Sequence, residues 1–182
     1  GGSSSTFTLS GGAYTSDQRN GTSLTATSSS FTYTMADGTV VTFDRNLAAN
    51  NASYYGKVAA VGTQILLTNG EKTTLSYLRS SYVSGSVTLY VLRLQSVTNN
   101  FGYQLHYNYF DASLSQSSVD NWVKIQSVQA INNAIDYCSP TANACTGLTQ
   151  SWPIVAYAYA ASGSNMIETK TDPLGRATRY TT

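Results

Sequence analysis

The most constraining feature of the sequence is a turn glycine that recurs at a fixed interval. Gly38, Gly70 and Gly102 lie 32 residues apart in both intervals. Such regular spacing indicates a repeat architecture rather than a β-sandwich without internal repeats. Asp37-Gly38 and Asn69-Gly70 are dipeptides typical of β-hairpins, because a type I′ turn needs positive φ at both central residues. We therefore expect these five residues to form equivalent hairpin turns.

Apolar and hydroxyl-bearing side chains alternate on both sides of these turns, which is the period of a half-buried strand. The chain contains 24 Thr, 25 Ser and 14 Tyr, and Thr and Tyr suit pleated surfaces. Only residues 46–54 favour a short turn of helix. The sequence thus predicts an all-β chain of consecutive antiparallel hairpins. The expected hairpins join residues 31–35 to 40–43, 65–68 to 73–77, 91–97 to 103–109, 124–130 to 135–137, and 166–171 to 176–180.

The last hairpin carries the most specific motif in the sequence. Residues 171–180 read T-D-P-L-G-R-A-T-R-Y, which resembles the core T-D-x-x-G-R-x-T-x-Y of the YD repeats of the Rhs family. The matching residues include Asp172, Gly175, Arg176 and Tyr180. Three upstream segments resemble the degenerate repeats of such proteins, at residues 31–38, 67–72 and 97–105.

The turn of this motif has a direct physical interpretation. Asp172 can accept hydrogen bonds from backbone N–H groups of its own turn, Pro173 fixes φ at the next position, and Gly175 takes the corner with positive φ. Tyr180 then lies on the sheet and can pack against a Tyr of a neighbouring hairpin. Some members of the family carry a self-cleaving aspartate protease with a paired D-P-x-G motif. We interpret the single D-P-x-G sequence at residues 172–175 as an ordinary repeat turn.

The resemblance implies successive hairpins stacked edge to edge into an extended, spiralling sheet. In the Rhs family such a sheet often forms a secreted, non-catalytic shell around a C-terminal toxin or effector domain. We therefore expect residues 1–182 to form one YD-repeat β-region, a fragment of a longer bacterial chain, with an irregular insert at about residues 110–152. Its partners would be adjacent repeats of the parent chain or further copies of itself.

The two cysteines, Cys138 and Cys145, bear on the compartment. Six residues separate them, the only histidine is His106, and no C-x-x-C pair occurs, so no metal site is expected. A disulfide that closes this eight-residue ring would stabilise the fold by about 2.5 kcal/mol. Such bonds persist in oxidising compartments. We expect this disulfide in a secreted or cell-surface protein; the alternative is a pair of buried free thiols.

The sequence offers no constellation of catalytic residues. His106 lies on the face opposite Tyr103, Leu105, Tyr107 and Tyr109 of an expected strand, where we expect it to face solvent. A general base would need a nucleophile and an orienting acid nearby, and no G-x-S-x-G motif is present. The carboxylates are isolated from one another, several of them in turns. We expect no enzymatic activity and no cofactor.

Charge and aromatic content limit the remaining partners. Ten basic and nine acidic residues give a net charge of +1 and form no basic stripe, so nucleic acid is not an expected partner. No apolar run is long enough for a membrane span. Exposed aromatic rows can bind sugars, but Tyr at period two is also what cross-strand packing uses. The candidate aromatic residues are Tyr107, Tyr109, Trp122, Trp152, Tyr157 and Tyr159.

These features favour a structural role as shell wall, scaffold or adhesive stalk. A self-assembling subunit of an extracellular fibre is the first alternative, because low charge along the strands leaves sheet edges open to pairing between chains. A carbohydrate-binding β-domain, with cell-surface glycans as its partners, is the second.

Overall fold

The computed structural model describes residues 5–48 and 60–182. Its contacts divide the chain into two compact units, Gly1–Leu75 and Ser76–Thr182. Regular structure is almost entirely antiparallel β, so the all-β prediction is confirmed. The described helices are short, with α1 at Arg45–Ala48 and α2 at Val119–Val123. Neither has the length or the apolar composition that a membrane-crossing helix requires.

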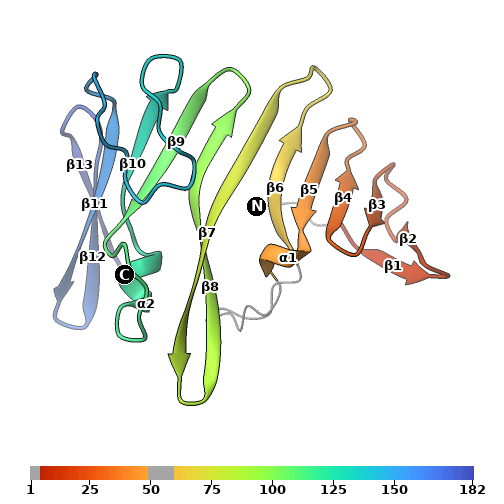
Figure 1. The fold of residues 1–182 in the computed structure, drawn as a ribbon, viewed down its shortest axis with the longest axis horizontal. Helices are drawn as coiled ribbons and strands as arrows, with labels where there is room; N and C mark the ends of the chain where they lie inside the picture. Colours follow the sequence, from red (N-terminus) through yellow and green to blue (C-terminus); the bar gives the residue numbers. More distant parts are fainter. Residues whose placement is uncertain (1–4, 49–59) are drawn as a thin grey trace. The chain divides into compact units, whose positions relative to one another are not determined.

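Hairpins follow one another along the first unit (Figure 1). β1 and β2 form a two-stranded sheet, whereas β3 to β7 are neighbours in a sheet of 11 strands. Tyr33 stands opposite Val41 and Phe31 opposite Phe43, so apolar side chains of β4 and β5 share one face. The strands of this unit are β1 (Phe7–Ser10), β2 (Ala13–Ser16), β3 (Ser23–Ala26), β4 (Ser30–Thr34), β5 (Val40–Asp44), β6 (Val61–Leu66) and the beginning of β7 (Lys72–Ser84).

The helix α1 begins directly after β5. The carboxylate of Asp44 accepts a hydrogen bond from the N–H of Leu47 at 2.8 Å, which satisfies a donor that the first helical turn leaves unpaired. The helical turn expected at residues 46–54 is therefore present at its start, and residues 49–54 lie outside the described part of the chain.

In the second unit the strands again pair with their neighbours in sequence. The strand order runs from β3 at one end to β13 at the other without a crossover. Consecutive hairpins produce such an order, since each antiparallel pair needs only a short connection. The further strands are β8 (Val87–Asn99), β9 (Tyr103–Tyr109), β10 (Ile125–Asn132), β11 (Ile154–Ser162), β12 (Asn165–Thr171) and β13 (Ala177–Thr181).

A small hydrophobic core of the second unit forms around α2. Trp122 is fully buried and packs with Val91 of β8 and Val119. A buried Trp removes about 150–250 Å² from water, so this one side chain anchors a helix too short to be stable alone. The helix spans five residues, and a helical period cannot be recognised over so short a segment. The partly buried residues around the core are Leu78, Tyr82, Leu114 and Val123.

The strand expected at residues 135–137 is wrong, because the chain turns away from the sheet after β10. The C=O of Asn132 accepts the N–H groups of Ile135 and Asp136, at 2.9 and 3.0 Å. The partner of β10 is β11 instead, with Gln129 opposite Ile154. Residues 133–153, here named the 133–153 loop, connect the two strands. The strand β10 therefore divides the expected irregular insert into two parts.

Candidate functional site

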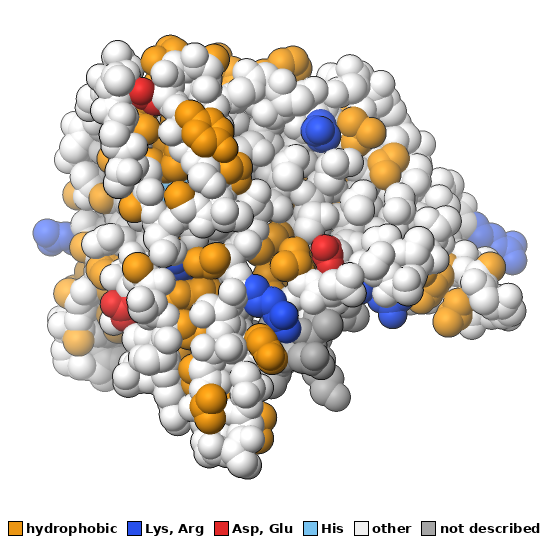
Figure 2. Space-filling view, in the orientation of Figure 1, with side chains coloured by type: hydrophobic (Ala, Val, Ile, Leu, Met, Phe, Trp, Pro, Cys, Tyr) orange, Lys and Arg blue, Asp and Glu red, His pale blue; other side chains and the backbone are white. Residues whose placement is uncertain are grey.

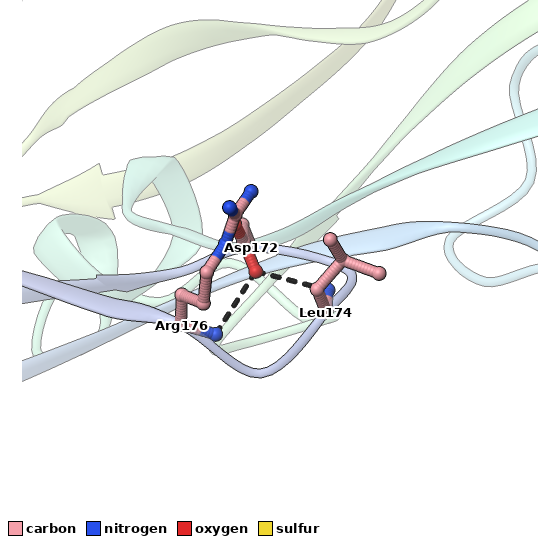
Figure 3. A network of polar contacts seen from close by, with 3 residues as sticks. All are labelled: Asp172, Leu174 and Arg176. Carbon is pink, nitrogen blue, oxygen red and sulfur yellow. Dashed lines mark hydrogen bonds and ion pairs between the residues drawn. The ribbon is translucent and has the colours of Figure 1, made fainter.

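The motif turn after β12 is organised by one carboxylate (Figure 3). Asp172 accepts the backbone N–H groups of Leu174 and Arg176, each at 2.9 Å, and the Arg176 Nε at 2.6 Å. The Arg176 backbone bond is the main cause that lowers the pKa of Asp172, against a smaller rise from burial. Gly175 has a φ of 80° and donates its N–H to the C=O of Asp172. Tyr180 lies on β13 opposite Glu168 and is half exposed.

The turn between β8 and β9 has the same arrangement. The side-chain oxygen of Asn99 accepts the N–H groups of Phe101 and Tyr103, at 3.1 and 2.9 Å. Gly102 has a φ of 89° and donates its N–H to the C=O of Asn99 at 3.2 Å. The sequence prediction included Gly102 but missed the role of Asn99. An Asp or Asn three residues before a turn glycine is the signal that could have found it.

The turns at Asp37-Gly38 and Asn69-Gly70 use a second arrangement. Each Asp or Asn side chain accepts the N–H of the residue two positions further on, at 2.9 Å. Each glycine has a φ of 85° and donates its N–H to the C=O three residues earlier, at 3.0 Å. Neither Asp37 nor Asn69 has a positive φ, so the expected type I′ turn is wrong. Instead, a three-residue loop closes each hairpin: two residues with negative φ (36–37 and 68–69) are followed by the glycine with positive φ.

A buried carboxylate fixes the 133–153 loop. Asp136 is 5% exposed and accepts four hydrogen bonds of 2.7–2.9 Å. Burial raises the pKa of Asp136, but the bonds from Thr149, Trp152 and Gln150 outweigh it and lower the pKa to about 2. The donors are the N–H and hydroxyl of Thr149, the N–H of Gln150 and the indole N–H of Trp152.

The predicted disulfide between Cys138 and Cys145 is present, with the two Cα atoms 5.4 Å apart. It lies within the 133–153 loop and beside β9, because Cys138 Sγ is 3.8 Å from Nδ1 of His106. The amide of Asn133, from the start of the same loop, donates to Gln104 Oε1 at 2.8 Å. The loop therefore covers part of β9.

The expectation that His106 faces solvent is wrong. His106 is 0% exposed and Gln104 1%, whereas Tyr103 is 59% and Leu105 43% exposed. The alternation along β9 is as expected, but its polar side faces inward, because the 133–153 loop supplies polar partners there. Burial lowers the pKa of His106, the Asn143 backbone opposes this, and the charge of Arg93 lowers it further. The imidazole is therefore neutral at pH 7.

Arg93 of β8 is a buried cation that makes both ring contacts and hydrogen bonds. It is 4% exposed, and its guanidinium lies 4.4 Å from the ring centroids of both Tyr109 and Trp122. Its hydrogen bonds reach Gln95 Oε1, the C=O groups of Asp111 and Trp122, and Asn143 Oδ1, at 2.7–3.2 Å. Burial lowers the pKa of Arg93, although Tyr109 opposes this. The salt bridge found among the described residues involves Arg176, not Arg93.

The chemistry open to this buried region is limited. Ligand atoms of His106, Cys138 and Cys145 lie within 4.8 Å of one another, but the sulfurs are bonded to each other, and a metal would need thiolates. Ser96 stands opposite His106, and both side chains are 0% exposed, so a substrate reaches neither in this structure. Ser96 Oγ and His106 Nε2 have no hydrogen-bond partner in the described part of the chain.

Four of the six aromatic residues considered for sugar binding make contacts within the protein: Tyr109, Trp122, Trp152 and Tyr159. Trp122 is buried, and the Tyr109 hydroxyl donates to the C=O of Leu94. Burial raises the pKa of Tyr109 to about 12, although Arg93 opposes this. Tyr159 packs against Phe110 at 5.9 Å. Tyr107 and Tyr157 are half-buried, and Trp152 donates to Asp136.

Charged side chains are few and dispersed on the face drawn in Figure 2, where uncharged side chains surround them. Among the described residues the salt bridge is that of Arg176 and Asp172, at 2.6 Å. The surface in this view therefore has no extended patch of like-charged side chains. That nucleic acid is not a partner stays a prediction.

Comparison with known proteins identifies no relative, since the chain matches no protein-family model and no curated protein at a significant level. The resemblance to YD repeats therefore rests on the residues of the chain itself, above all on residues 171–180.

Proposed function

We propose that this chain is a structural, non-catalytic segment of a secreted protein similar to the Rhs family, in which consecutive hairpins extend a sheet. The sheet would serve as shell wall, scaffold or adhesive stalk. The observation that carries the proposal is the strand order, in which 11 strands are neighbours in the order of the sequence. A chain built in this way lengthens its sheet with each added hairpin and needs no rearrangement of the earlier strands.

The edge strand β13 supports this role. Met166 and Thr182 exchange both of their backbone hydrogen bonds, at 2.9 and 3.0 Å. Bonded and non-bonded pairs alternate along an antiparallel ladder, so every second residue of β13, counted back from Thr182, bonds to β12. The backbone N–H and C=O groups of the other residues point away from β12. Those residues are Ala177, Arg179 and Thr181. A further strand could bond to these groups.

The buried polar groups of the second unit support a structural role as well. Arg93, His106 and Asp136 hold backbone and loop groups in place and are not exposed to a ligand. The disulfide beside them is consistent with an oxidising compartment, which supports a location outside the cell or at its surface. Adjacent repeats or further copies of the chain are the proposed partners, and surface glycans are a further candidate.

Duplication of the last hairpin tests sheet extension. Gly163 and Ser164 connect β11 to β12, and Ser162 stands opposite Asn165. The next residue, Met166, bonds to Thr182 on the β13 side. By alternation Asn165 bonds back to Ser162, so the backbone groups of Ser162 point toward β12. Thr181 has the equivalent orientation. In the duplicated chain, a second copy of residues 163–182 follows Thr181 in place of Thr182. The copied β12 should then pair with β13 as a new strand.

The measurement is amide hydrogen exchange by NMR. We expect the amides of Arg179 and Thr181 to exchange much more slowly in the duplicated chain, while the amide of Lys170, already bonded, stays as it was. Unchanged exchange at Arg179 and Thr181 would show that β13 does not accept another strand, and would contradict the proposal.

Assembly into a fibre remains the alternative, because the same edge could pair with another copy. All five residues of β13 are exposed, and β3 stands at the other end of the strand order. Pairing of unlike edges does not close by necessity and produces filaments. Sedimentation velocity over a range of concentrations tests this, with Arg179→Pro to block the edge and Arg179→Thr as the matched control. A compact monomer at every concentration excludes the fibre and leaves the scaffold.

A further inference from the structure

The first unit contains a pocket beneath its N-terminal hairpin. β1 and β2 lie over the apolar face of β4: Phe7 packs edge-on against Tyr33 with ring centroids 5.8 Å apart, and Tyr14 against Phe31 at 6.0 Å. The hydroxyls of Ser5 and Tyr33 are hydrogen-bonded at 2.9 Å. Between the hairpin and the sheet remains a cavity of about 690 Å³, which is within the usual range for small-molecule sites.

Aromatic and aliphatic side chains form the apolar part of this pocket. Phe7, Tyr33 and Phe43 contribute rings, and Leu24 and Met35 contribute aliphatic surface. The rings come from β1, β4 and β5, so three strands hold them. Such rings can pack against the C–H face of a flat apolar or amphipathic molecule.

The polar part of the pocket lies in the turn between β2 and β3. Asn20 donates to Gln18 Oε1 at 3.1 Å, and the Thr22 hydroxyl donates to Asn20 Oδ1 at 2.7 Å. These three residues line the pocket and hold one another in position. Between them lies Arg19 with a φ of 47°, the positive-φ residue other than glycine in the described chain. Strain of this kind collects at ligand-binding sites.

The charge of the lining selects between ligand classes. Asp37 lines the pocket, and no Lys, Arg or His is among the described residues that do so. One oxygen of Asp37 accepts the N–H of Thr39 at 2.9 Å; a carboxylate has capacity for further donors. The hydrogen bonds of Thr39 lower the pKa of Asp37, so the group is ionised at neutral pH. A negative charge without a cation disfavours anionic ligands such as phosphates.

We propose that this pocket binds a neutral mono- or disaccharide. A sugar combines a C–H face, which suits the rings of Phe7, Tyr33 and Phe43, with hydroxyl donors, which suit Asp37 and the polar turn. An organic cation would also suit a carboxylate beside aromatic rings, but Ser5, Thr22 and Tyr33 line the pocket as well, and hydroxyl oxygens can accept further hydrogen bonds from a sugar. This binding goes beyond the scaffold role and does not depend on it.

The equivalent turns of the chain offer a matched pair of variants. Asp37 and Asn69 accept the same backbone hydrogen bond at the same position of their turns, both at 2.9 Å. Asp37→Asn therefore removes the charge from the pocket while keeping the turn. Asn69→Asp makes the reverse change in a turn that does not line the pocket. Thermal melting of both variants should stay close to that of the parent chain.

Saturation-transfer NMR with cellobiose, maltose, lactose and N,N′-diacetylchitobiose tests the proposal, with tetramethylammonium as the competing class. We expect transfer to the ring protons of at least one sugar. Loss of a charge-assisted hydrogen bond should weaken that sugar's affinity about tenfold or more in Asp37→Asn, and Asn69→Asp should leave it unchanged. Absence of transfer to all four sugars, equal affinity in Asp37→Asn, or tighter binding of tetramethylammonium than of every sugar would each overturn the proposal.

Discussion

The side chains of Asn99 and Asp172 make the same pair of backbone hydrogen bonds in two different hairpins. Each accepts the N–H groups of the residues two and four positions further on, at 2.9–3.1 Å. In both turns a positive-φ glycine follows three positions after the accepting residue. An amide oxygen and a carboxylate oxygen are thus interchangeable at this position, because the turn needs only an acceptor.

This equivalence predicts the outcome of substitutions at Asp172. Asp172→Asn should keep the backbone bonds to Leu174 and Arg176 and lose only the exposed ion pair, which contributes little. Asp172→Ala should lose the backbone bonds too. Amide exchange at Leu174 and Arg176 measures this: we expect near-parent rates in the Asn variant and clearly faster rates in the Ala variant. Similar rates in the two variants would show that the side chain does not hold the turn.

The lowered pKa of Asp136 predicts that the stability of the fold depends on pH. Its pKa of about 2 in the folded protein lies below the ordinary value of 3.8. Its contribution to stability is therefore complete above the ordinary value and is lost as the pH falls through the folded value. Melting temperatures of the parent and of Asp136→Asn should differ most near neutral pH and converge between about pH 4 and 2.

A control for this experiment is Asp120→Asn, which changes an exposed carboxylate of α2. This variant keeps Asp136 and should therefore retain the acid-induced loss of stability that Asp136 causes. A constant difference between the parent and Asp136→Asn across the whole range would contradict the assignment.

The turn glycines predict a cost for side chains at positive φ. At Gly70 an added Cβ meets no atom within 4 Å, so any loss in Gly70→Ala comes from the backbone conformation alone. We expect about 1–2 kcal/mol from the left-handed geometry. Gly62→Ala is the control, because its φ is not positive and its Cβ would make ordinary contacts with the Phe43 ring. Chemical denaturation of both variants measures the difference, and equal midpoints would refute the explanation.

The disulfide predicts a loss of stability on reduction. Closure of the short ring between Cys138 and Cys145 contributes about 2.5 kcal/mol on the loop-entropy estimate, so the double Cys→Ser variant should unfold at lower denaturant concentration. The unreduced protein should resist alkylation of its thiols, and reduction should raise the intact mass by two hydrogens. Two thiols that react freely in the unreduced, folded protein would exclude the bond.

The buried hydrogen bonds of Arg93 should make even a conservative substitution destabilising. Lys cannot reproduce the planar fork that reaches the C=O groups of Asp111 and Trp122 and the amide of Asn143. Arg93→Lys leaves buried acceptors unpaired, so we expect a loss of roughly 2–4 kcal/mol in the free energy of unfolding. Arg79→Lys should cost less, because Arg79 is only partly buried and stacks on the Tyr90 ring. Equal losses at the two positions would argue against this account.

Local pattern was sufficient to predict most of the sheet. The hairpins at β4–β5, β6–β7, β8–β9 and β12–β13 follow from alternation and from turn residues, which act within a few positions of the chain. The strand β11 was missed, and the return of β10 was placed at residues 135–137. Both errors have one cause: the distant groups that bind Asp136 decide the path of the 133–153 loop, and local alternation contains no information on them.

The burial of His106 and Arg93 could not be predicted for a similar reason. Alternation along β9 shows that polar and apolar side chains lie on opposite faces, but not which face is covered. Polar partners from the 133–153 loop cover the side of Gln104 and His106. The pocket beneath β1 and β2 also depends on contacts between segments, since Phe7 and Tyr33 are far apart in sequence. Its residues carry no motif that would have singled them out.

The boundary between the two compact units falls between Leu75 and Ser76, inside the thirteen residues of β7. The strand β7 therefore contains residues of both units. A break at that point would divide β7 directly behind Lys72, Thr73 and Thr74, which pair with β6, and would separate them from the rest of the strand. Recombination between proteins of this kind would preserve the ladder only with joints in the turns, as at Gly70 or Gly85. Whole hairpins, rather than compact units, are thus the pieces that such a chain can gain, lose or exchange.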